Sequence, residues 1–199
     1  NFSELSYKMS FHDLEDNEDG FLQGAQINMG NLILRAYEDE SARLQRFDVV
    51  SIFSLTPRSL LFKPLSWRIY TGTERQYTFG KDRLVAHVTG GAGFAYQPFN
   101  NNIVYGMLMG RFERNSAFDK KVTPALGASL GMIHHFGKST VKLEISGEEF
   151  ENDVYRHRGS YTQNFVISRN HSVLLHATRE EQLNIQFSEA GIRYQYYFY

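Results

Sequence analysis

The sequence predicts an all-β fold, an antiparallel transmembrane β-barrel of about ten to twelve strands, with twelve slightly favoured. Three observations lead to this prediction. Apolar and polar residues alternate within short segments, turn-forming residues separate these segments at regular intervals, and glycines lie inside the segments. Alternation gives a strand one apolar and one polar face, and regular spacing of such strands is typical of a barrel or a sandwich.

Alternating segments define about eleven expected strands. An acidic loop at residues 12–20 follows the first, and Pro57 and Pro64 bracket another loop, because proline cannot donate a ladder hydrogen bond. Bacterial single-chain barrels have an even number of strands, so we expect one boundary to be wrong and both termini to lie on the periplasmic side. The segments cover residues 2–11, 24–37, 42–55, 65–72, 83–96, 102–113, 122–136, 139–150, 155–168, 171–179 and 183–199.

Glycines inside the expected strands favour a barrel over a sandwich. Glycine weakens strand pairing and commonly marks a bend or a close backbone approach. Small residues let the wall of a narrow barrel curve and leave room for larger interior side chains. The glycines concerned are Gly90, Gly91, Gly93, Gly106, Gly110, Gly127 and Gly131.

Composition limits the class of protein. The 199 residues predict a single domain, residues 1–199, and no apolar run reaches the roughly 20 residues of a membrane helix. A net charge of −1 offers no basic field to nucleic acid. Without cysteine there is no thiol nucleophile, disulfide or cysteine-bound zinc, and we expect no cofactor. Because strand-like alternation begins at once, the chain is expected to lack its signal peptide or to be the C-terminal part of a longer precursor.

The last residues resemble the C-terminal targeting signal of Gram-negative outer-membrane barrels. That resemblance implies the outer membrane, with its lipid and lipopolysaccharide, and the barrel assembly machinery as partners. The residues that carry the signal are Gly191, Tyr194, Tyr196, Phe198 and Tyr199.

With the apolar face turned toward lipid, the opposite face carries charges of both signs. An unpaired buried charge is very costly, so the main expectation is a lumen plugged by paired Arg, Lys and Glu side chains. A selective water-filled pore and a catalytic or ligand site are the alternatives. The lumen-lining candidates are Arg68, His87, Thr89, Ser129, Lys142, Glu144, His176 and Arg193.

Catalytic and metal-binding patterns are weak in this sequence. No His-x-Ser pair occurs, although His87 and His176 each lie two residues before a threonine and could act as a base toward it. The adjacent pair His134–His135 points to opposite faces of a strand and so cannot share one ion. The acidic loop only partly fits a calcium-binding pattern, with Gln26 where a bidentate glutamate is needed. We therefore assign no catalytic residue and no metal site, and we favour a domain without enzymatic activity.

Four sequence runs resemble the C-terminal barrel region of proteobacterial envelope proteins. Those proteins carry an N-terminal periplasmic domain that is lacto-N-biosidase-like, with a papain-like fold. The resemblance implies a membrane-anchoring barrel whose partner domain lies outside these residues. The runs are residues 11–16, 20–27, 47–58 and 62–68, of which Lys63-Pro-Leu-Ser-Trp-Arg68 is the most specific.

The sequence thus predicts an outer-membrane barrel that anchors or displays a periplasmic domain. Three alternatives remain open at this point. They are a narrow channel for small solutes, a barrel hydrolase acting on lipid A or phospholipid, and a soluble lipocalin-like carrier.

Overall fold

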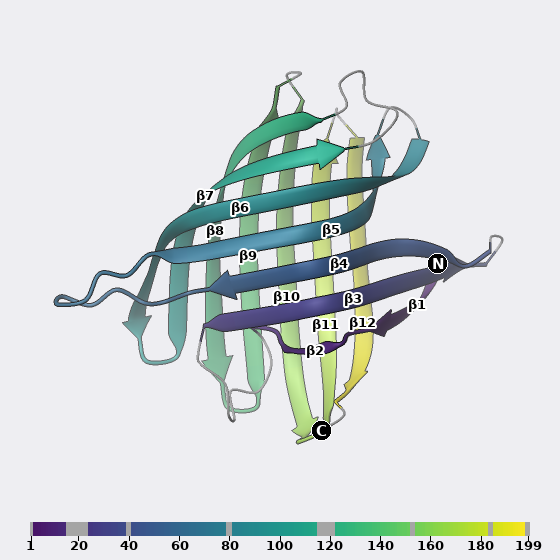
Figure 1. The fold of residues 1–199 in the computed structure, drawn as a ribbon. Helices are drawn as coiled ribbons and strands as arrows, with labels where there is room; N and C mark the ends of the chain where they lie inside the picture. The colour runs from purple at the N-terminus through teal and green to yellow at the C-terminus, as the bar shows by residue number, and fades with distance from the viewer. Residues whose placement is uncertain are drawn as a thin grey trace.

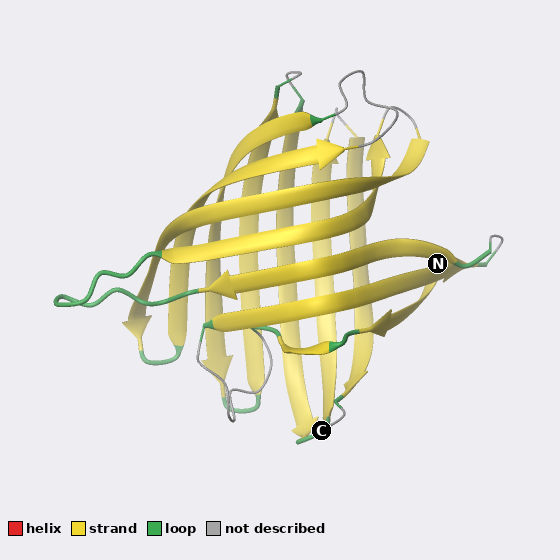
Figure 2. Cartoon of the chain, in the orientation of Figure 1, coloured by secondary structure: helices red, strands yellow, loops and turns green. Residues whose placement is uncertain are grey.

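The structure, a computed structural model, describes residues 2–14, 24–38, 41–78, 81–114, 122–151, 154–182 and 185–197. These residues form a single β-sheet, and no helix occurs within them (Figures 1 and 2). Accordingly, no helix in these ranges is long and apolar enough to cross a membrane. The strands are β1 Phe2–Tyr7, β2 Ser10–His12, β3 Ala25–Tyr37, β4 Arg43–Ser54, β5 Ser66–Thr78, β6 Lys81–Phe99, β7 Asn102–Arg114, β8 Thr123–Phe136, β9 Ser139–Phe150, β10 Tyr155–Ser168, β11 His171–Gln182 and β12 Ile185–Tyr196.

Neighbouring strands pair antiparallel throughout the sheet, in the order β1-β3-β4-β5-β6-β7-β8-β9-β10-β11-β12. Both β1 and β2 pair with β3, at residues 32–37 and 27–29 respectively. Because β4 occupies the other edge of β3, β1 and β2 form one interrupted edge strand. The predicted all-β antiparallel fold is confirmed, and the sheet has eleven places in its strand order.

The first and last strands run in the same direction, because eleven strands alternate in direction along the sheet. The start of β1 and the end of β12 therefore lie at opposite ends of the strands. The expectation that both termini lie on one side, which assumed an even number of strands, is wrong for this sheet. We call the end of the sheet at which β12 finishes the C-terminal end.

The sheet curls until its two edges approach each other. In Figure 1, β1, β3, β4, β5 and β6 cross in front of β9, β10, β11 and β12. Side chains join the two edges across the interior, since Arg35 of β3 bonds Glu189 of β12 and Arg193 of β12 bonds Glu4 of β1. The curled sheet therefore has a concave inner face and a convex outer face.

Strand β7 shows how the two faces differ. Met107, Met109, Arg111 and Glu113 are buried on the inner face, whereas Leu108 between them is 74% exposed. Similar exposure of large apolar side chains recurs around the outer side of the sheet. We call these residues the outer apolar face, and they include Leu5, Ile27, Met29, Trp67, Ile69, Val88, Phe94, Leu108, Phe112, Leu126, Leu130, Leu143, Ile145, Ile192 and Tyr194.

The interior is apolar toward the C-terminal end. Leu14, from the segment after β2, is buried there beside the last residues of β4 and the first of β7. This apolar cluster contains Leu14, Phe53, Leu55, Ala95, Ile103, Tyr105, Met107, Met109 and Ile133.

One glycine illustrates why small residues occur in these strands. A Cβ atom at Gly131 of β8 would overlap the ring of Tyr105 on neighbouring β7, so only glycine admits that ring at this point in the wall. The position agrees with the expected role of glycine in leaving room for large interior side chains.

Candidate functional site: the charged interior

The charged interior begins where the apolar cluster ends. Charged residues occupy the same alternate positions of the strands as the apolar interior residues do nearer the C-terminal end, as in Met107, Met109, Arg111 and Glu113 of β7. Other strands continue this pattern, with Glu74 on β5 and Arg156 on β10. Strand alternation thus directs several ionisable groups into one enclosed space.

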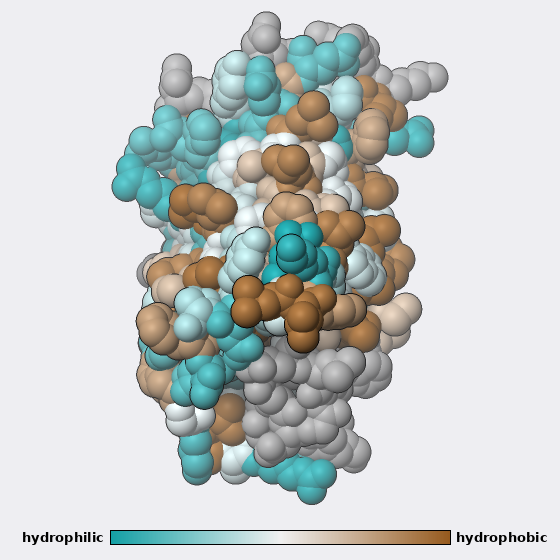
Figure 3. All heavy atoms as spheres, turned by 90° about the vertical axis from the view of Figure 1, so that its left-hand side faces the viewer, coloured by the Kyte–Doolittle hydropathy of each residue, from teal (hydrophilic) through white to brown (hydrophobic). Residues whose placement is uncertain are grey.

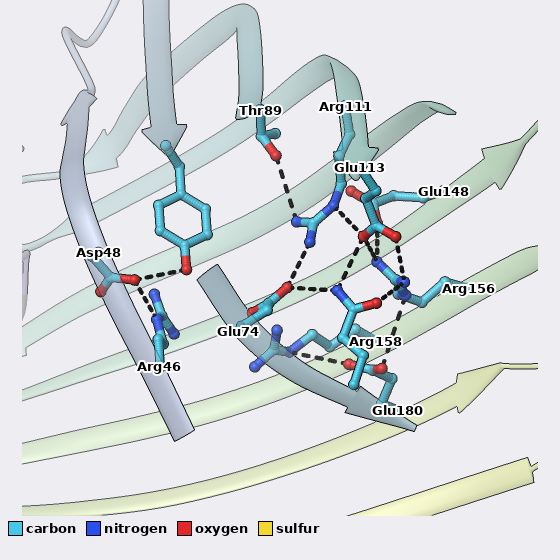
Figure 4. Close-up of polar contacts among 12 residues, drawn as sticks. Arg46, Asp48, Glu74, Thr89, Arg111, Glu113, Glu148, Arg156, Arg158 and Glu180 are labelled. Carbon is cyan, nitrogen blue, oxygen red and sulfur yellow. Dashed lines mark hydrogen bonds and ion pairs between the residues drawn. The ribbon is translucent and has the colours of Figure 1, made fainter. Parts of the chain in front are cut away.

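The central group connects four strands (Figure 4). Arg111 Nη2 lies 2.5 Å from Glu74 Oε1, and Arg111 Nε lies 2.7 Å from Glu113 Oε1. Arg156 Nη1 donates to the same Glu113 oxygen at 2.9 Å and to Glu148 Oε2 at 3.2 Å. The side chains of Arg111, Glu113 and Arg156 are all less than a tenth exposed. Each charge is therefore compensated by opposite charges from other strands, which a buried ionic group requires.

A neutral residue, Gln76, and a further glutamate, Glu180, also contact this group. Gln76 of β5 donates to both Glu74 and Glu113 at 3.0 Å and accepts a 2.8 Å hydrogen bond from Arg156. Glu180 of β11 lies 3.9 Å from both Arg156 and Arg158. The network thereby extends from β5 through β7, β9 and β10 to β11.

A second group surrounds Asp48 of β4, whose side chain is only 2% exposed. Arg46 Nε donates to Asp48 Oδ1 at 2.6 Å, and the Tyr70 hydroxyl donates to the same oxygen at 2.8 Å. Asn31 Nδ2 donates to the other oxygen at 2.8 Å. Asp48 thus holds together β3, β4 and β5 on the interior side.

A third group lies at the boundary with the apolar cluster. Glu144 of β9 accepts a 2.9 Å hydrogen bond from Arg68 Nη1 of β5. Its other oxygen accepts a 2.5 Å hydrogen bond from the hydroxyl of Tyr105, which belongs to the apolar cluster. These contacts cross the interior between the two halves of the curled sheet.

The fourth group joins the two sheet edges. Glu189 of β12 accepts hydrogen bonds from Arg35 of β3 at 2.7 and 2.6 Å, and His176 Nε2 lies 3.6 Å from it. Glu4 of β1 accepts from Arg35 at 2.9 Å and also from Arg193 of β12. Alternating positive and negative groups therefore link β3, β1 and β12. The described residues of β1 and β12 form no backbone pairing with each other, so these side chains are the contacts seen between the two edges.

A cavity of about 620 Å³ remains among these four groups. Its wall includes members of each of them, for example Arg111, Arg46, Arg68 and Glu189. The space is large enough for a small polar solute or for several water molecules.

The structure places all eight lumen-lining candidates on the inner face. Arg68 pairs with Glu144, and Thr89 is buried within 3.5 Å of Arg111. The cavity wall contains Arg68, Thr89, Lys142, Glu144, His176 and Arg193, whereas His87 and Ser129 are almost fully buried and do not line it.

His87 and His176, the two histidines considered as the base of a hydrolase, are not paired with a nucleophile among the described residues. His87 packs its ring 4.2 Å from that of Tyr70, and within the described part of the chain neither of its ring nitrogens has a hydrogen-bond partner. Thr89 therefore lacks the hydrogen bond to a base that activates a nucleophile. His176 faces Glu189 rather than Thr178.

The remaining patterns from the sequence lie elsewhere. Gly191, Tyr194 and Tyr196 lie on β12, while Phe198 and Tyr199 lie outside the described residues. Within the acidic loop, residues 15–20 also lie outside them. His135 Nδ1 lies 3.1 Å from Thr140, and His134 bonds Asn102, so this pair has separate partners. Among the described residues, no group of His, Cys, Asp and Glu side chains is arranged to hold a metal ion.

Sequence reasoning missed most of the central network. Glu74, Arg111, Glu113 and Arg156 were not among the candidates, although Arg111-Phe-Glu113 carries a usable signal. Opposite charges two residues apart point to the same face of a strand and can pair there. Arg46-Phe-Asp48 shows the same spacing and also forms a pair.

Comparison with solved structures finds an anion-selective porin from Comamonas acidovorans, with 13% sequence identity and a TM-score of 0.40. The alignment covers 95% of this chain and 54% of the porin, so the chain spans about half the length of that protein. A comparison with curated proteins finds no match. A family model matches residues 1–197, and the chain belongs to that family, which is described as a domain of unknown function (DUF7840).

Proposed function

We propose that the chain forms a β-barrel in the outer membrane of a Gram-negative bacterium and anchors a periplasmic domain. The observation that carries the proposal is that large apolar side chains are exposed and charged side chains are buried, the reverse of a soluble protein. Leu108, Leu126 and Ile192 are at least 74% exposed on the outer face, while Arg111, Glu113 and Arg156 are buried inside. Lipid reverses the usual rule for soluble proteins, since the outer surface must then be apolar and ions must lie within.

Closure of the barrel follows from the same proposal. An open sheet edge in hydrocarbon leaves backbone groups without partners, at several kcal/mol for each group. The edge strands β1 and β12 are brought together by Glu4, Arg35, Glu189 and Arg193. These contacts support a seam at which β1 and β12 meet side by side and in the same direction.

The interior of the proposed barrel is narrowed by paired side chains. Ion pairs cross it at Arg68 and Glu144 and at Arg156 and Glu113, while the apolar cluster fills the C-terminal end. A barrel closed in this way holds a domain at the membrane without opening a wide passage. The anchoring role itself rests on the resemblance of the Lys63–Arg68 run and three other runs to envelope proteins with a periplasmic domain.

The direction of the strands adds a condition to the anchoring role. If the C-terminal end faces the periplasm, as for barrels assembled from a C-terminal signal, the start of β1 faces the exterior. A periplasmic domain attached ahead of residue 2 would then require one further crossing of the membrane between that domain and β1.

Purification with and without detergent tests the membrane proposal. We expect a β-rich protein, by far-UV circular dichroism, that needs detergent and migrates differently on a gel before and after boiling. A monodisperse protein that stays soluble without detergent would instead favour the lipocalin-like carrier.

A narrow channel is the second candidate, because the cavity of about 620 Å³ is lined by charged groups. Single-channel recording in planar bilayers distinguishes the two. The anchor predicts no steady conductance from the unmodified protein, whereas a channel predicts discrete steps that change when Arg111 or Glu74 in the cavity wall is replaced.

A further inference from the structure

The loop between β4 and β5 exposes three consecutive apolar side chains at its tip. Leu60 and Leu61 are 96% and 99% exposed and Phe62 is 66% exposed, the first two being the most exposed large apolar residues described. Lys63 follows them and is also exposed. We call residues 56–65 the apolar loop. Such a group of exposed apolar residues commonly marks a surface that contacts another molecule or a membrane.

The apolar loop is held in a defined conformation. The Ser59 backbone N–H donates to the Phe62 carbonyl at 2.8 Å, and the Phe62 N–H donates to Ser59 Oγ at 3.0 Å, which closes the tip. Arg58 fixes the returning chain, because its Nε donates to the Pro64 carbonyl at 3.1 Å and its Nη2 to the Lys63 carbonyl at 3.4 Å. The apolar side chains are thus presented by an ordered turn.

Backbone groups at the base of the loop also have partners. The Thr56 N–H donates to Ser66 Oγ at 3.2 Å, and the Arg58 N–H donates to the Ala95 carbonyl of β6 at 2.8 Å. Pro57 and Pro64 have no N–H group to satisfy. Backbone groups beside an apolar medium need internal partners, and those named at the base of the loop have them.

The loop lies on the outer side of the wall. The Arg58 guanidinium carbon stands 3.8 Å from the ring centroid of Phe94, a member of the outer apolar face. In Figure 1 the loop projects sideways, to the left, whereas the β6–β7 and β8–β9 turns at the same end of the sheet point downward. Figure 3, which looks onto that side, shows apolar surface at mid-height of the visible face.

We propose that the apolar loop is a lateral anchor that inserts Leu60, Leu61 and Phe62 into the lipid of the surrounding membrane, with Lys63 at the lipid phosphates. This inference rests on the proposed membrane barrel. Lipid is the occupant because the loop continues the outer apolar face through Leu65 and Trp67 and leaves the wall sideways. A lysine beside inserted apolar residues keeps its ammonium group at the headgroups while its stem stays in the apolar region.

Trp67 makes a direct test possible, because it is the single tryptophan and lies on the outer apolar face. Three proteins are folded into phosphatidylcholine vesicles with and without bromine on the acyl chains. In the unmodified protein, the fluorescence of Trp67 reports the surroundings of the barrel wall. In Leu61→Trp with a Trp67→Phe background, the fluorescence of the new tryptophan reports the surroundings of the loop tip. Lys138→Trp in the same background reports an exposed turn at the same end of the sheet.

The proposal predicts that bromine quenches the Leu61→Trp emission, which is blue-shifted and shielded from iodide, while Lys138→Trp stays in water. It is overturned if the tip behaves like Lys138→Trp although bromine quenches Trp67, a result that would leave the loop free for a protein partner. If Trp67 also escapes quenching, the membrane barrel itself is wrong and the lipid anchor fails with it. Should the Trp67→Phe background not fold, a Leu61→Cys variant carrying an environment-sensitive dye replaces it, since the chain has no other cysteine.

Discussion

Arg35 on β3 donates hydrogen bonds to both carboxylate oxygens of Glu189 on β12, at 2.7 and 2.6 Å, although 154 positions separate them in the sequence. Strand β3 is the second strand from one edge of the sheet, and β12 forms the opposite edge. A bidentate pair fixes both distance and orientation. This contact therefore shows that the sheet curls until side chains from near its two edges bond each other.

Replacing Glu189 with glutamine should loosen this seam. The neutral amide has one acceptor oxygen instead of two, so it cannot form the bidentate pair with Arg35 or compensate its charge, and we expect a loss of about 1–3 kcal/mol in the free energy of unfolding. Urea titration of the folded protein in vesicles measures the change. The matched control is Glu149→Gln, whose carboxylate accepts a hydrogen bond from the exposed Tyr155 hydroxyl, and it should shift stability by less than about 0.5 kcal/mol. Equal effects of the two substitutions would show that the seam contact adds no stability.

Glu113 should be among the most sensitive interior residues. Glu113→Gln removes the charge that compensates both Arg111 and Arg156, whose side chains are 8% and 6% exposed. Breaking a buried ion pair from one side costs about 3–5 kcal/mol, so the variant should unfold at much lower urea than Glu149→Gln. Stability within about 1 kcal/mol of the original protein would mean that water reaches and solvates these arginines.

Leu108, at the middle of β7, distinguishes lipid from water on the outer face. It is 74% exposed, so Leu108→Arg in a soluble protein should change stability by less than about 0.5 kcal/mol. At the middle of a bilayer the same change should cost about 2–4 kcal/mol. Refolding equilibria in vesicles measure this difference, with Leu108→Ala as the control for lost apolar contact.

The stability contributed by Asp13 should depend on pH in the acidic range. Burial would raise the pKa of Asp13, but the charge and hydrogen bond of Lys8, together with a hydrogen bond from Asn28, outweigh burial and lower the pKa to about 2. A lowered pKa favours the folded state above the ordinary value near 4, and this contribution disappears as the pH falls toward 2. Asp13→Asn should therefore unfold more easily at pH 6, and the difference from the original protein should shrink between about pH 4 and pH 2. A constant difference across that range would contradict the proposed role of Lys8.

Single-cysteine labelling tests the direction of the strands. Ser41, between β3 and β4, and Lys138, between β8 and β9, lie at opposite ends of the sheet and are both exposed. In intact cells an impermeant maleimide should label Ser41→Cys, whereas Lys138→Cys should react only after the outer membrane is permeabilised. Labelling of both variants from outside would be incompatible with a wall that spans the membrane.

The sequence allowed most of the strands to be predicted, because alternation is a local property. Strand β5 was predicted too short, at residues 65–72 instead of Ser66–Thr78. Its outward positions beyond Ile69 are occupied by Thr71, Thr73 and Arg75, which interrupt the apolar pattern. The bend at residues 8–9 likewise divides one predicted strand into β1 and β2.

The interior contacts were harder to predict than the faces. Lumen-side positions such as Arg68 and Glu144 follow from alternation, but their pairing depends on which strands lie opposite each other after the sheet curls. Arg156 and Glu113 are 43 residues apart on strands that do not neighbour each other. One sequence contains no signal for such a contact, whereas Arg111 and Glu113 could have been paired from their spacing alone.

A spin-label scan along β7 tests the membrane barrel most directly. The chain has no cysteine, so residues 107–113 can each be replaced by a labelled cysteine and measured in vesicles. We expect a period of two, with labels at Leu108, Gly110 and Phe112 accessible to lipid-dissolved oxygen and those at Met107, Met109 and Arg111 shielded from it. Labels at Leu108 and Phe112 that are accessible to water-soluble nickel reagents instead of oxygen would contradict it, because the outer apolar face would then lie in water.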